Sequence, residues 1–328
     1  MTHSIGNSIH RKPDRKPDTL HSNVCMQKYV VIAPCYNEEQ VITAFLKELE
    51  SIFIRTNFLF TVIVVDDCST DQTLARLKTF SFEDSRFELH ILRLKYNVGH
   101  QGAIRQGLIY ASSINALGFI VMDSDGEDDP NAILQLTETP AFDIKFVSRG
   151  KRKESFTFKA GYFFYKILFK VISGNQINFG NYSMISKRVL NAIHAQNFDH
   201  YSAFLSKQKF EKVFLKYDRR KRIDGQSKMN MNSLVIHGLK SLIEYSEQLL
   251  FFFIKVMLIL FIALMVYAGY VFYCYFISQK AILGWTSTIA IGLINSILTT
   301  AGIIVLGLLI VSNKNRINNR DDIFFKEE

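Results

Sequence analysis

The sequence is poor in the residues that mark redox and metal–thiolate proteins. Its 328 residues include only four cysteines, Cys25, Cys35, Cys68 and Cys274, and no two of them have C-x-x-C spacing. Without paired cysteines, a zinc–thiolate site or a disulfide oxidoreductase is not supported. We therefore expect reduced thiols and no thiol nucleophile.

Two sequence signals are also missing near the amino end. The segment 29–34 reads as a buried strand, but PCYNEE (34–39) follows it where a dinucleotide-dependent dehydrogenase would have G-x-G-x-x-G. Residues 1–27 contain no apolar run like that of a signal peptide and repeat the polar tetrad RKPD. We interpret 1–27 as a flexible basic tail.

Charge is absent from two long segments near the carboxyl end. Residues 256–277 and 285–312 contain no charged side chain and are strongly apolar. Each is long enough to cross a hydrocarbon layer of about 30 Å, which predicts two transmembrane helices joined by a tight hairpin at 278–280. The alternative is a pair of buried core helices. The preceding segment, 232–255, is expected to be juxtamembrane and amphipathic.

Basic residues flank the two apolar segments unevenly. Five basic residues lie outside the pair of segments: Lys240, Lys255, Lys314, Arg316 and Arg320. Only Lys280 lies in the hairpin between them. The positive-inside rule then places the large amino-terminal region, both termini and the tail 313–328 on the cytoplasmic side of the cytoplasmic membrane.

The region 28–231 alternates apolar strands with amphipathic helical segments. The predicted strands are 29–34, 61–67, 90–94 and 118–122. Continuous apolar strands separated by helices favour an α/β fold, with a mostly parallel sheet and helices on both faces.

Three of these strands end in polar clusters. Tyr36-Asn37-Glu38 follows the first strand, Asp66-Asp67 ends the second, and Asp123-x-Asp125 follows the fourth. Strand ends of a parallel sheet meet at one edge, where ligands bind. The stretch VMDSDGEDDP (121–130) adds three more carboxylates, and crowded carboxylates are typical ligands of a hard divalent cation. A solvated acidic loop or a helix cap is the alternative.

Two later segments remain open. FTFKAGYFFYKILFKVISG (156–174) suits a helix in a membrane interface or a core helix with a lysine edge. The basic cluster 217–229 suits binding of phosphate groups or of anionic lipid headgroups. We assign its charge to these partners and expect no nucleic acid.

Six short motifs in order resemble those of the family 2 glycosyltransferases. They are PCYNEE (34–39), DDCSTD (66–71), NVGHQGA (97–103), MDSDGEDDP (122–130), SRGKR (148–152) and R-x-x-R-x-x-G-x-S-K (219–228). Within that family the chain is similar to the polyprenyl-phosphate glycosyltransferases, which include dolichol-phosphate mannose synthase and bacterial undecaprenyl-phosphate sugar transferases. The resemblance implies a nucleotide-sugar-binding GT-A domain.

The resemblance also implies roles for individual residues. Nucleotide-sugar contacts fall on Pro34, Tyr36, Glu38, Asp66, Asp67 and Asp123, with Asp66 near the base. Asp125 is implied to bind Mg²⁺ or Mn²⁺, and Glu127, where relatives usually have Gln, to join the metal. Phosphates of the donor or of the lipid acceptor are implied to meet Arg149, Arg219, Arg222, Ser227 and Lys228. The implied catalytic set is Asp123, Asp125, Arg149 and Arg222.

The chain departs from the family pattern at three positions. Cys68 stands where relatives have Gly, Asn181 where many have Asp, and Ser183 where many have Arg. The last two put the sugar specificity, and to a lesser degree activity, in question.

The function implied is metal-dependent, inverting transfer of a sugar from a nucleoside-diphosphate sugar, UDP- before GDP-linked, to a polyprenyl phosphate at the lipid bilayer. A processive polysaccharide synthase would carry Q-x-x-R-W in this domain, and the single tryptophan is Trp285. A non-catalytic membrane partner in lipid-linked sugar export and a transferase with another acceptor stay open. The membrane relatives suggest a homo-oligomer.

Overall fold

The protein is described by a computed structural model over residues 26–139, 142–149, 179–217, 244–278, 284–316 and 324–327. Its described strands form one sheet in the order β7-β5-β6-β4-β1-β2-β3-β8. The strands are β1 (Lys28–Cys35), β2 (Leu59–Asp66), β3 (Phe87–Leu94), β4 (Gly118–Val121), β5 (Ile144–Arg149), β6 (Phe179–Ser186), β7 (Lys212–Tyr217) and β8 (Phe324–Glu327). The four strands expected from the sequence are confirmed.

The central strands run parallel, as predicted. β1 pairs in parallel with β2 and β4, β2 pairs in parallel with β3, and β5 pairs in parallel with β7. β6 runs antiparallel to β4 and β5, and β8 runs antiparallel to β3. The β4–β6 pairing sets Val121 opposite Ser183, so the chain beyond β4 approaches the segment before Ser183.

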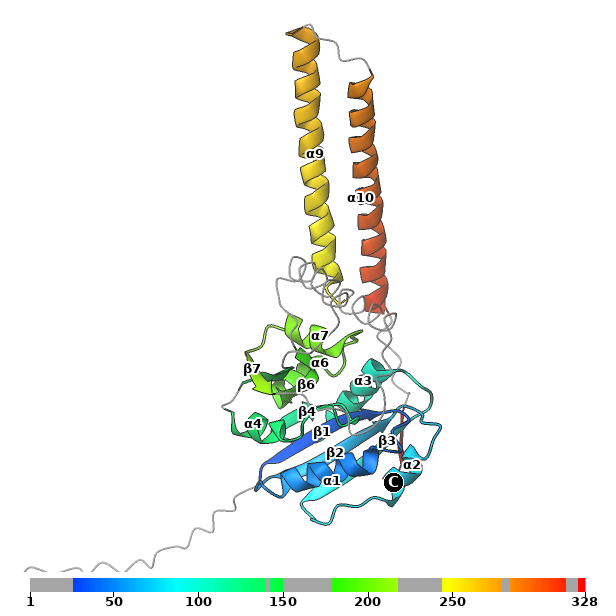
Figure 1. Cartoon of the computed structure of the whole chain (residues 1–328), viewed down its shortest axis with the longest axis vertical. Helices are drawn as coiled ribbons and strands as arrows, with labels where there is room; N and C mark the ends of the chain where they lie inside the picture. Colours follow the sequence, from blue (N-terminus) through cyan, green and yellow to red (C-terminus); the bar gives the residue numbers. More distant parts are fainter. Residues whose placement is uncertain are drawn as a thin grey trace, which may run out of the picture.

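Helices cover both faces of the sheet (Figure 1). They are α1 (Ile42–Phe53), α2 (Thr73–Thr79), α3 (His100–Ala111), α4 (Ala132–Glu138), α6 (Lys187–Ile193) and α7 (Tyr201–Lys207), followed by α9 (Ser246–Phe276) and α10 (Trp285–Arg316). Because side chains of a strand alternate, Val30 and Ile32 of β1 pack with α3, α6 and α7, while Val31 and Ala33 pack with α1, α2 and α4. Gly107 lets α3 approach β1 closely, since a Cβ there would collide with Ile32.

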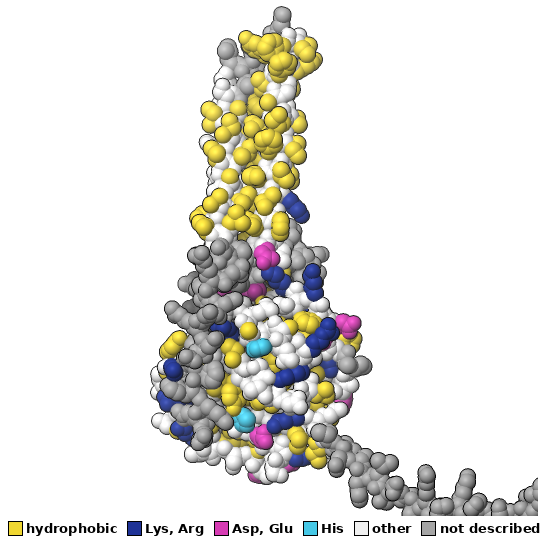
Figure 2. Space-filling model, turned by 180° about the vertical axis from the view of Figure 1, so that it is seen from behind, with side chains coloured by type: hydrophobic (Ala, Val, Ile, Leu, Met, Phe, Trp, Pro, Cys, Tyr) yellow, Lys and Arg dark blue, Asp and Glu magenta, His cyan; other side chains and the backbone are white. Residues whose placement is uncertain are grey.

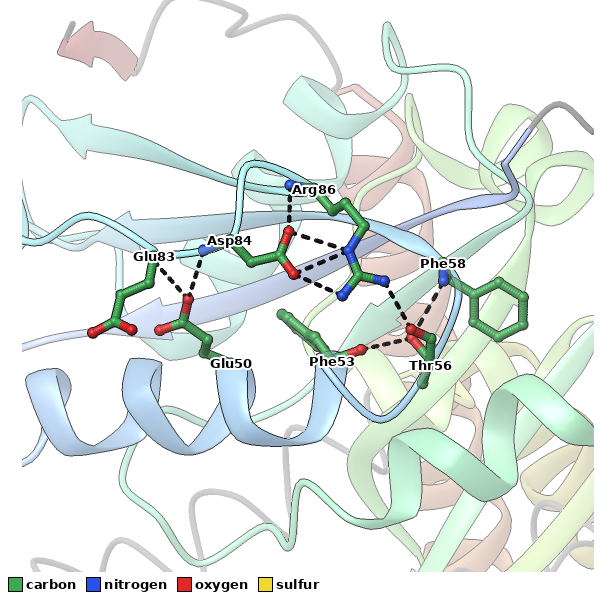
Figure 3. Close-up of polar contacts among 7 residues, drawn as sticks. All are labelled: Glu50, Phe53, Thr56, Phe58, Glu83, Asp84 and Arg86. Atoms are coloured by element: carbon green, nitrogen blue, oxygen red, sulfur yellow. Dashed lines mark hydrogen bonds and ion pairs between the residues drawn. The ribbon is translucent and has the colours of Figure 1, made fainter.

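Two polar side chains fix the loop between α2 and β3 (Figure 3). Glu50 of α1 is buried, and its Oε1 accepts hydrogen bonds from the backbone N–H of Glu83 at 2.7 Å and of Asp84 at 3.3 Å. Arg86 binds the Asp84 carboxylate through Nη2, at 2.6 Å, and donates from Nη1 to the carbonyl of Thr56 at 3.0 Å. This cluster lies at the amino end of β3, opposite the strand ends that carry the acidic motifs.

Two long helices, α9 and α10, extend from the domain side by side (Figure 1). Ser246–Phe276 and Ser287–Leu309 are long and apolar enough to span a membrane. Their apolar side chains face outward, for example Ile259 at 66% and Val266 at 69% exposure. Figure 2 shows the same apolar surface along the pair. The alternative of two buried core helices therefore does not describe them.

The helix bounds differ from the sequence expectation. α9 begins at Ser246, inside the segment 232–255 that was expected to be juxtamembrane, because no Gly or Pro interrupts the approach to the apolar run. The expected hairpin at 278–280 is too short, since α9 ends at Phe276 and α10 begins at Trp285. α10 continues to Arg316, into the expected tail 313–328.

The tail also contains a strand that the sequence did not reveal. β8 pairs along the edge of β3, from Ile91 opposite Glu327 to Leu94 opposite Phe324. The chain that leaves the domain through α9 thus returns to the same domain after α10. The start of α9 and the end of α10 therefore both lie toward the sheet domain.

Candidate active site

The loops after β1 and β2 are joined by reciprocal hydrogen bonds. Asn37 donates its backbone N–H to Ser69 Oγ at 3.0 Å, and its Oδ1 accepts from the Thr70 N–H at 2.8 Å. Asn37 has a φ of 54°, a left-handed conformation that asparagine tolerates better than most residues. The backbone N–H of Glu38 is bonded to Thr73 Oγ1 at 2.9 Å. These contacts hold the two strand ends as one rim, on which Tyr36 is 43% exposed.

Asp66 and Asp67, at the end of β2, are both buried. Asp66 Oδ1 accepts from the Ser69 N–H at 3.1 Å, while its Oδ2 has no hydrogen-bond partner among the described residues. Burial raises the pKa of both carboxyls. Asp67 Oδ1 accepts from the Val98 N–H at 2.7 Å. Asp67 therefore fixes the loop before α3, whereas Asp66 keeps one buried acceptor oxygen unused.

The loop held by Asp67 places His100 in front of the acidic motif after β4. His100 is the first residue of α3, after Gly99 with a φ of 78°. Its Nε2 lies 3.2 Å from Asp123 Oδ1 and 2.9 Å from Asn181 Nδ2. Burial alone would lower the pKa of His100, but the Asp123 carboxylate outweighs burial, so the pKa is raised. A histidine thus joins the first acid of the motif to β6.

The acidic run after β4 divides into two groups. Asp128 is buried, and its Oδ2 accepts from the Asp123 N–H at 3.0 Å; Asp129 Oδ1 accepts from the Asn131 N–H at 2.9 Å. These two carboxylates shape the loop. Asp125 Oδ1 accepts from the Glu127 N–H at 3.0 Å across Gly126, which has a φ of 77°. Asp123, Asp125 and Glu127 are only partly buried, as is Asp129.

The turn is also tied to the first strand. The hydroxyl of Ser124, between the two acids of the motif, donates to the carbonyl of Pro34 at 2.7 Å. The backbone N–H of Asp67 donates to the carbonyl of Cys35 at 2.9 Å. The ends of β1, β2 and β4 therefore meet at one rim, and the polar clusters that the sequence placed there lie together.

The carboxylates at this rim are suited to binding a hard divalent metal ion together with a ligand that supplies the remaining oxygen atoms. No group of three His, Cys, Asp or Glu side chains with the spacing of a metal site occurs in the part of the chain that the structure describes. Mg²⁺ is often held by one or two carboxylates together with substrate phosphates. Asp125 and Glu127, brought onto one turn by Gly126, fit that arrangement.

Several residues implied by the resemblance fall outside the described ranges. These are Arg219, Arg222, Ser227 and Lys228, and of Arg149 only the backbone is described, at the end of β5. The segment 156–174, the cluster 217–229 beyond Tyr217, and residues 232–243 also lie outside.

Sequence reasoning assigned no role to His100, Asn97 or Asp128. Asn97 donates from Nδ2 to the carbonyl of Asp67 at 3.2 Å, and its Oδ1 accepts from the Gly99 N–H at 3.1 Å. The sequence does contain one signal for His100: it is the first residue of a helix that begins directly after the turn Asn97-Val98-Gly99. Its proximity to Asn181 depends on the antiparallel β4–β6 pairing, which no local pattern shows.

These features define an α/β fold of the GT-A type, with a polar, acidic rim at the carboxyl ends of a mostly parallel sheet. The family model for glycosyl transferase family 2 matches residues 30–193, and the chain belongs to this family. The protein is accordingly a glycosyltransferase.

Individual similarities agree with this assignment. An uncharacterized glycosyltransferase of Bacillus subtilis, YkcC, is 25% identical over 291 residues, 87% of each chain. A dolichyl-phosphate beta-glucosyltransferase of Drosophila melanogaster is 38% identical over 101 residues, 29% of this chain and 30% of the relative. Among solved structures, the fold is similar to glucosyl-3-phosphoglycerate synthase from Mycobacterium tuberculosis with Mn²⁺, UDP-glucose and phosphoglyceric acid (TM-score 0.50, 12% identity, 73% of this chain and 85% of that chain).

Proposed function

We propose that this glycosyltransferase moves a sugar from a nucleoside-diphosphate sugar to a polyprenyl phosphate. The observation that carries the proposal is that the sheet domain with the acidic rim is joined to two exposed helices of membrane length. The chain leaves this domain into α9, and after α10 it returns to the domain as β8. An enzyme built onto such helices is suited to an acceptor that lies in the bilayer. The similarity to a dolichyl-phosphate glucosyltransferase supports the same acceptor class.

The β1–β2 rim supports a nucleotide donor. Asp66 Oδ2 is a buried acceptor with no hydrogen-bond partner in the described part of the chain, and the imide N–H of a uracil ring would satisfy it. Tyr36, exposed on the rim beside it, offers a ring for the base. We favour UDP over GDP; the solved neighbour with UDP-glucose is consistent with that choice.

The acidic turn supports the diphosphate end of the donor. Asp125 and Glu127 would hold Mg²⁺ or Mn²⁺ together with the donor diphosphate, as the Mn²⁺ in the solved neighbour suggests. The bound ion would neutralise the charge that develops on the leaving diphosphate. Asp67, through the Val98 N–H, and Asp128, through the Asp123 N–H, keep the two flanking loops in place for that ligand.

The reaction itself needs few protein groups. An oxygen of the acceptor phosphate bonds to the anomeric carbon, the bond from that carbon to the diphosphate oxygen breaks, and its electron pair leaves with the diphosphate. A phosphate monoester is mostly dianionic at neutral pH, because its second pKa is about 6, so little or no general base is needed. Direct displacement inverts the anomeric carbon. Phosphate-binding roles for Arg149, Arg219, Arg222, Ser227 and Lys228 follow from the resemblance and complete the proposal.

The proposed location is the cytoplasmic membrane, with the sheet domain on the cytoplasmic side. The excess of basic residues outside the apolar segments supports this orientation. The return of the chain from α10 to β8 also supports this orientation, since a chain that crosses the membrane twice has the residues before the first span and after the second on the same side.

The test is transfer from a panel of UDP- and GDP-sugars to undecaprenyl phosphate, by full-length protein in detergent with Mg²⁺ or Mn²⁺. Asp125→Asn is the test variant, and Asp129→Asn is its control in the same acidic run, since asparagine keeps the oxygen that accepts from the Asn131 N–H. We expect one lipid product of inverted configuration, lost with EDTA. Its yield should fall at least about 100-fold in Asp125→Asn, a loss typical for a group that stabilises developing charge, and stay within about threefold in the control. Absence of any lipid product from folded wild-type protein would refute the acceptor assignment.

A further inference from the structure

A buried polar junction lies where the first long helix leaves the sheet domain. Glu244 and Tyr245, the two residues before α9, are only 3% and 1% exposed. Tyr245 Oη lies 2.6 Å from Ser206 Oγ, and Glu244 Oε2 accepts from the Asp199 N–H at 3.0 Å. Ser206 belongs to α7, and Asp199 lies just before it. Because buried polar groups are costly unless bonded, these contacts fix the start of α9 on α7.

The other end of α7 touches the candidate active site at two points. The backbone N–H of Tyr201 donates to Gln101 Oε1 at 2.6 Å, and Tyr201 Oη lies 3.2 Å from Ser183 Oγ. Gln101 is the neighbour of His100 on α3. The Ser183 hydroxyl also donates to the carbonyl of Asn181 at 3.0 Å. One contact of α7 is therefore to the neighbour of His100, and the other is to Ser183, which bonds the backbone of Asn181, the residue that meets His100.

The helix between these contacts is a compact, buried unit. Tyr201, Phe204 and Leu205 are buried in the core face that also holds α3 and α6. Close-packed interiors shift as units and do not absorb a displacement of one side alone. A movement of α9 at Tyr245 is thus passed to Tyr201, about one helix length away. Phe198 stacks on Phe204 at 5.4 Å between ring centroids and stiffens the turn before α7.

We propose that α7 is a positioning element that fixes the active-site rim relative to the bilayer, acting through Tyr245 at one end and Tyr201 at the other. The inference rests on the proposed lipid acceptor and adds residues that neither the motifs nor the acidic rim includes. A sugar nucleotide dissolved in water can reach the rim at any orientation of the rim relative to the membrane. A phosphate anchored by a lipid chain reaches the rim only at a fixed height. The junction therefore acts on use of the acceptor and not on binding of the donor.

The test compares Tyr245→Phe with Tyr110→Phe in full-length protein in lipid nanodiscs. Tyr110 supplies the control, because its hydroxyl bonds to His90 Nδ1 at 3.2 Å near the carboxyl end of α3, away from α7. The Tyr245 hydroxyl contacts Ser206 Oγ and, more weakly, the Ala203 carbonyl at 3.4 Å, both in α7. For Tyr245→Phe we expect kcat/KM for undecaprenyl phosphate to fall about tenfold, since removal of a buried hydrogen-bonded hydroxyl costs on the order of 1 kcal/mol. The KM for the sugar nucleotide should stay within about twofold. The control should change neither value.

A second pair of measurements separates this role from a general loss of structure. Ser206→Ala should give an acceptor-side loss no larger than that of Tyr245→Phe, because Tyr245 keeps its bond to the Ala203 carbonyl, and the double variant should lose no more than Tyr245→Phe. Equal losses on the donor and acceptor sides, or none on either side, would overturn the proposal.

Absence of a lipid product from wild-type protein would refute the proposed acceptor. In that case hydrogen exchange still tests whether α7 connects α9 to the site. In nanodiscs, Tyr245→Phe should speed exchange of the Tyr201 amide, which is bonded to Gln101, about tenfold, while the amides of β1 and β2 keep their rates. Unchanged exchange at Tyr201 would show that α7 does not connect α9 to the site.

Discussion

Asp66→Asn should make the protein more stable at neutral pH while removing most of its activity. The Asp66 side chain is fully buried at the end of β2, with one carboxylate oxygen bonded to the Ser69 N–H and the other without a partner among the described residues. Asparagine keeps an oxygen for Ser69 and removes a buried charge. Leaving a buried polar group unsatisfied costs about 1–3 kcal/mol, and more when the group is charged, so we expect the variant to gain about 2 kcal/mol.

The sign and the pH range of this effect follow from the raised pKa of Asp66. A carboxyl whose pKa is higher in the folded state than in the unfolded state binds its proton more tightly when folded, so its contribution to stability is lost as the pH rises through the folded pKa. Below the unfolded value of about 3.9 the wild-type side chain is neutral in both states, and the advantage of asparagine should shrink. Above the folded pKa the difference should be constant.

The assay is thermal unfolding of both full-length proteins in detergent, from pH 3 to pH 8, so that the range includes the unfolded pKa of about 3.9. A gain of about 2 kcal/mol corresponds to roughly 4–8 °C in Tm for a domain of this size. Donor-dependent transfer should fall at least about tenfold, because the amide N–H₂ replaces the acceptor oxygen proposed for the base. A lower Tm for the variant at pH 8, or a difference that does not vary with pH, would refute the view that Asp66 is held in a strained, charged state for its ligand.

Three further changes test the scaffold around the site. Glu50→Ala leaves two part-buried backbone N–H groups without their acceptor and should lower the unfolding free energy by about 1–2 kcal/mol, whereas Glu50→Gln should lose less than about 1 kcal/mol. The KM for the sugar nucleotide should not change in either variant, and a changed KM would contradict a purely structural role. Cys68 has a φ of 61°, so Cys68→Gly should be at least as stable as wild type in thermal unfolding, and Cys68→Val should lose about 1–2 kcal/mol; the reverse order would disprove strain at this turn. Lys145 is buried, donates to two carbonyls at the end of α4, and has a pKa lowered by burial; Lys145→Met should cost about 2 kcal/mol, and full stability of this variant would show that the carbonyls need no donor.

Local sequence patterns were sufficient for the four parallel strands β1 to β4 and for the acidic rim, but not for β5 to β8. Continuous apolar strands such as 29–34 and 118–122 predict a parallel sheet because only strands covered on both faces are apolar throughout. Polar residues directly after such strands must lie at one edge, so Asp66, Asp67 and Asp123 could be grouped without coordinates. Long uncharged runs likewise predict membrane-length helices from composition alone.

The tertiary structure decided how the charges at that edge divide between loop and ligand. The spacing of the five carboxylates after β4 does not show their partners: Asp128 is buried and accepts from the Asp123 N–H, Asp129 accepts from the Asn131 N–H, and Asp125, partly buried, accepts from the Glu127 N–H across Gly126. His100 meets Asp123 and Asn181 only because β6 runs antiparallel beside β4. The strand β8 and the contact of Tyr245 with α7 also join residues far apart in the chain. A hydrophobic period records which face of an element is buried, whereas hydrogen bonds between distant segments depend on register and packing, which no local window contains.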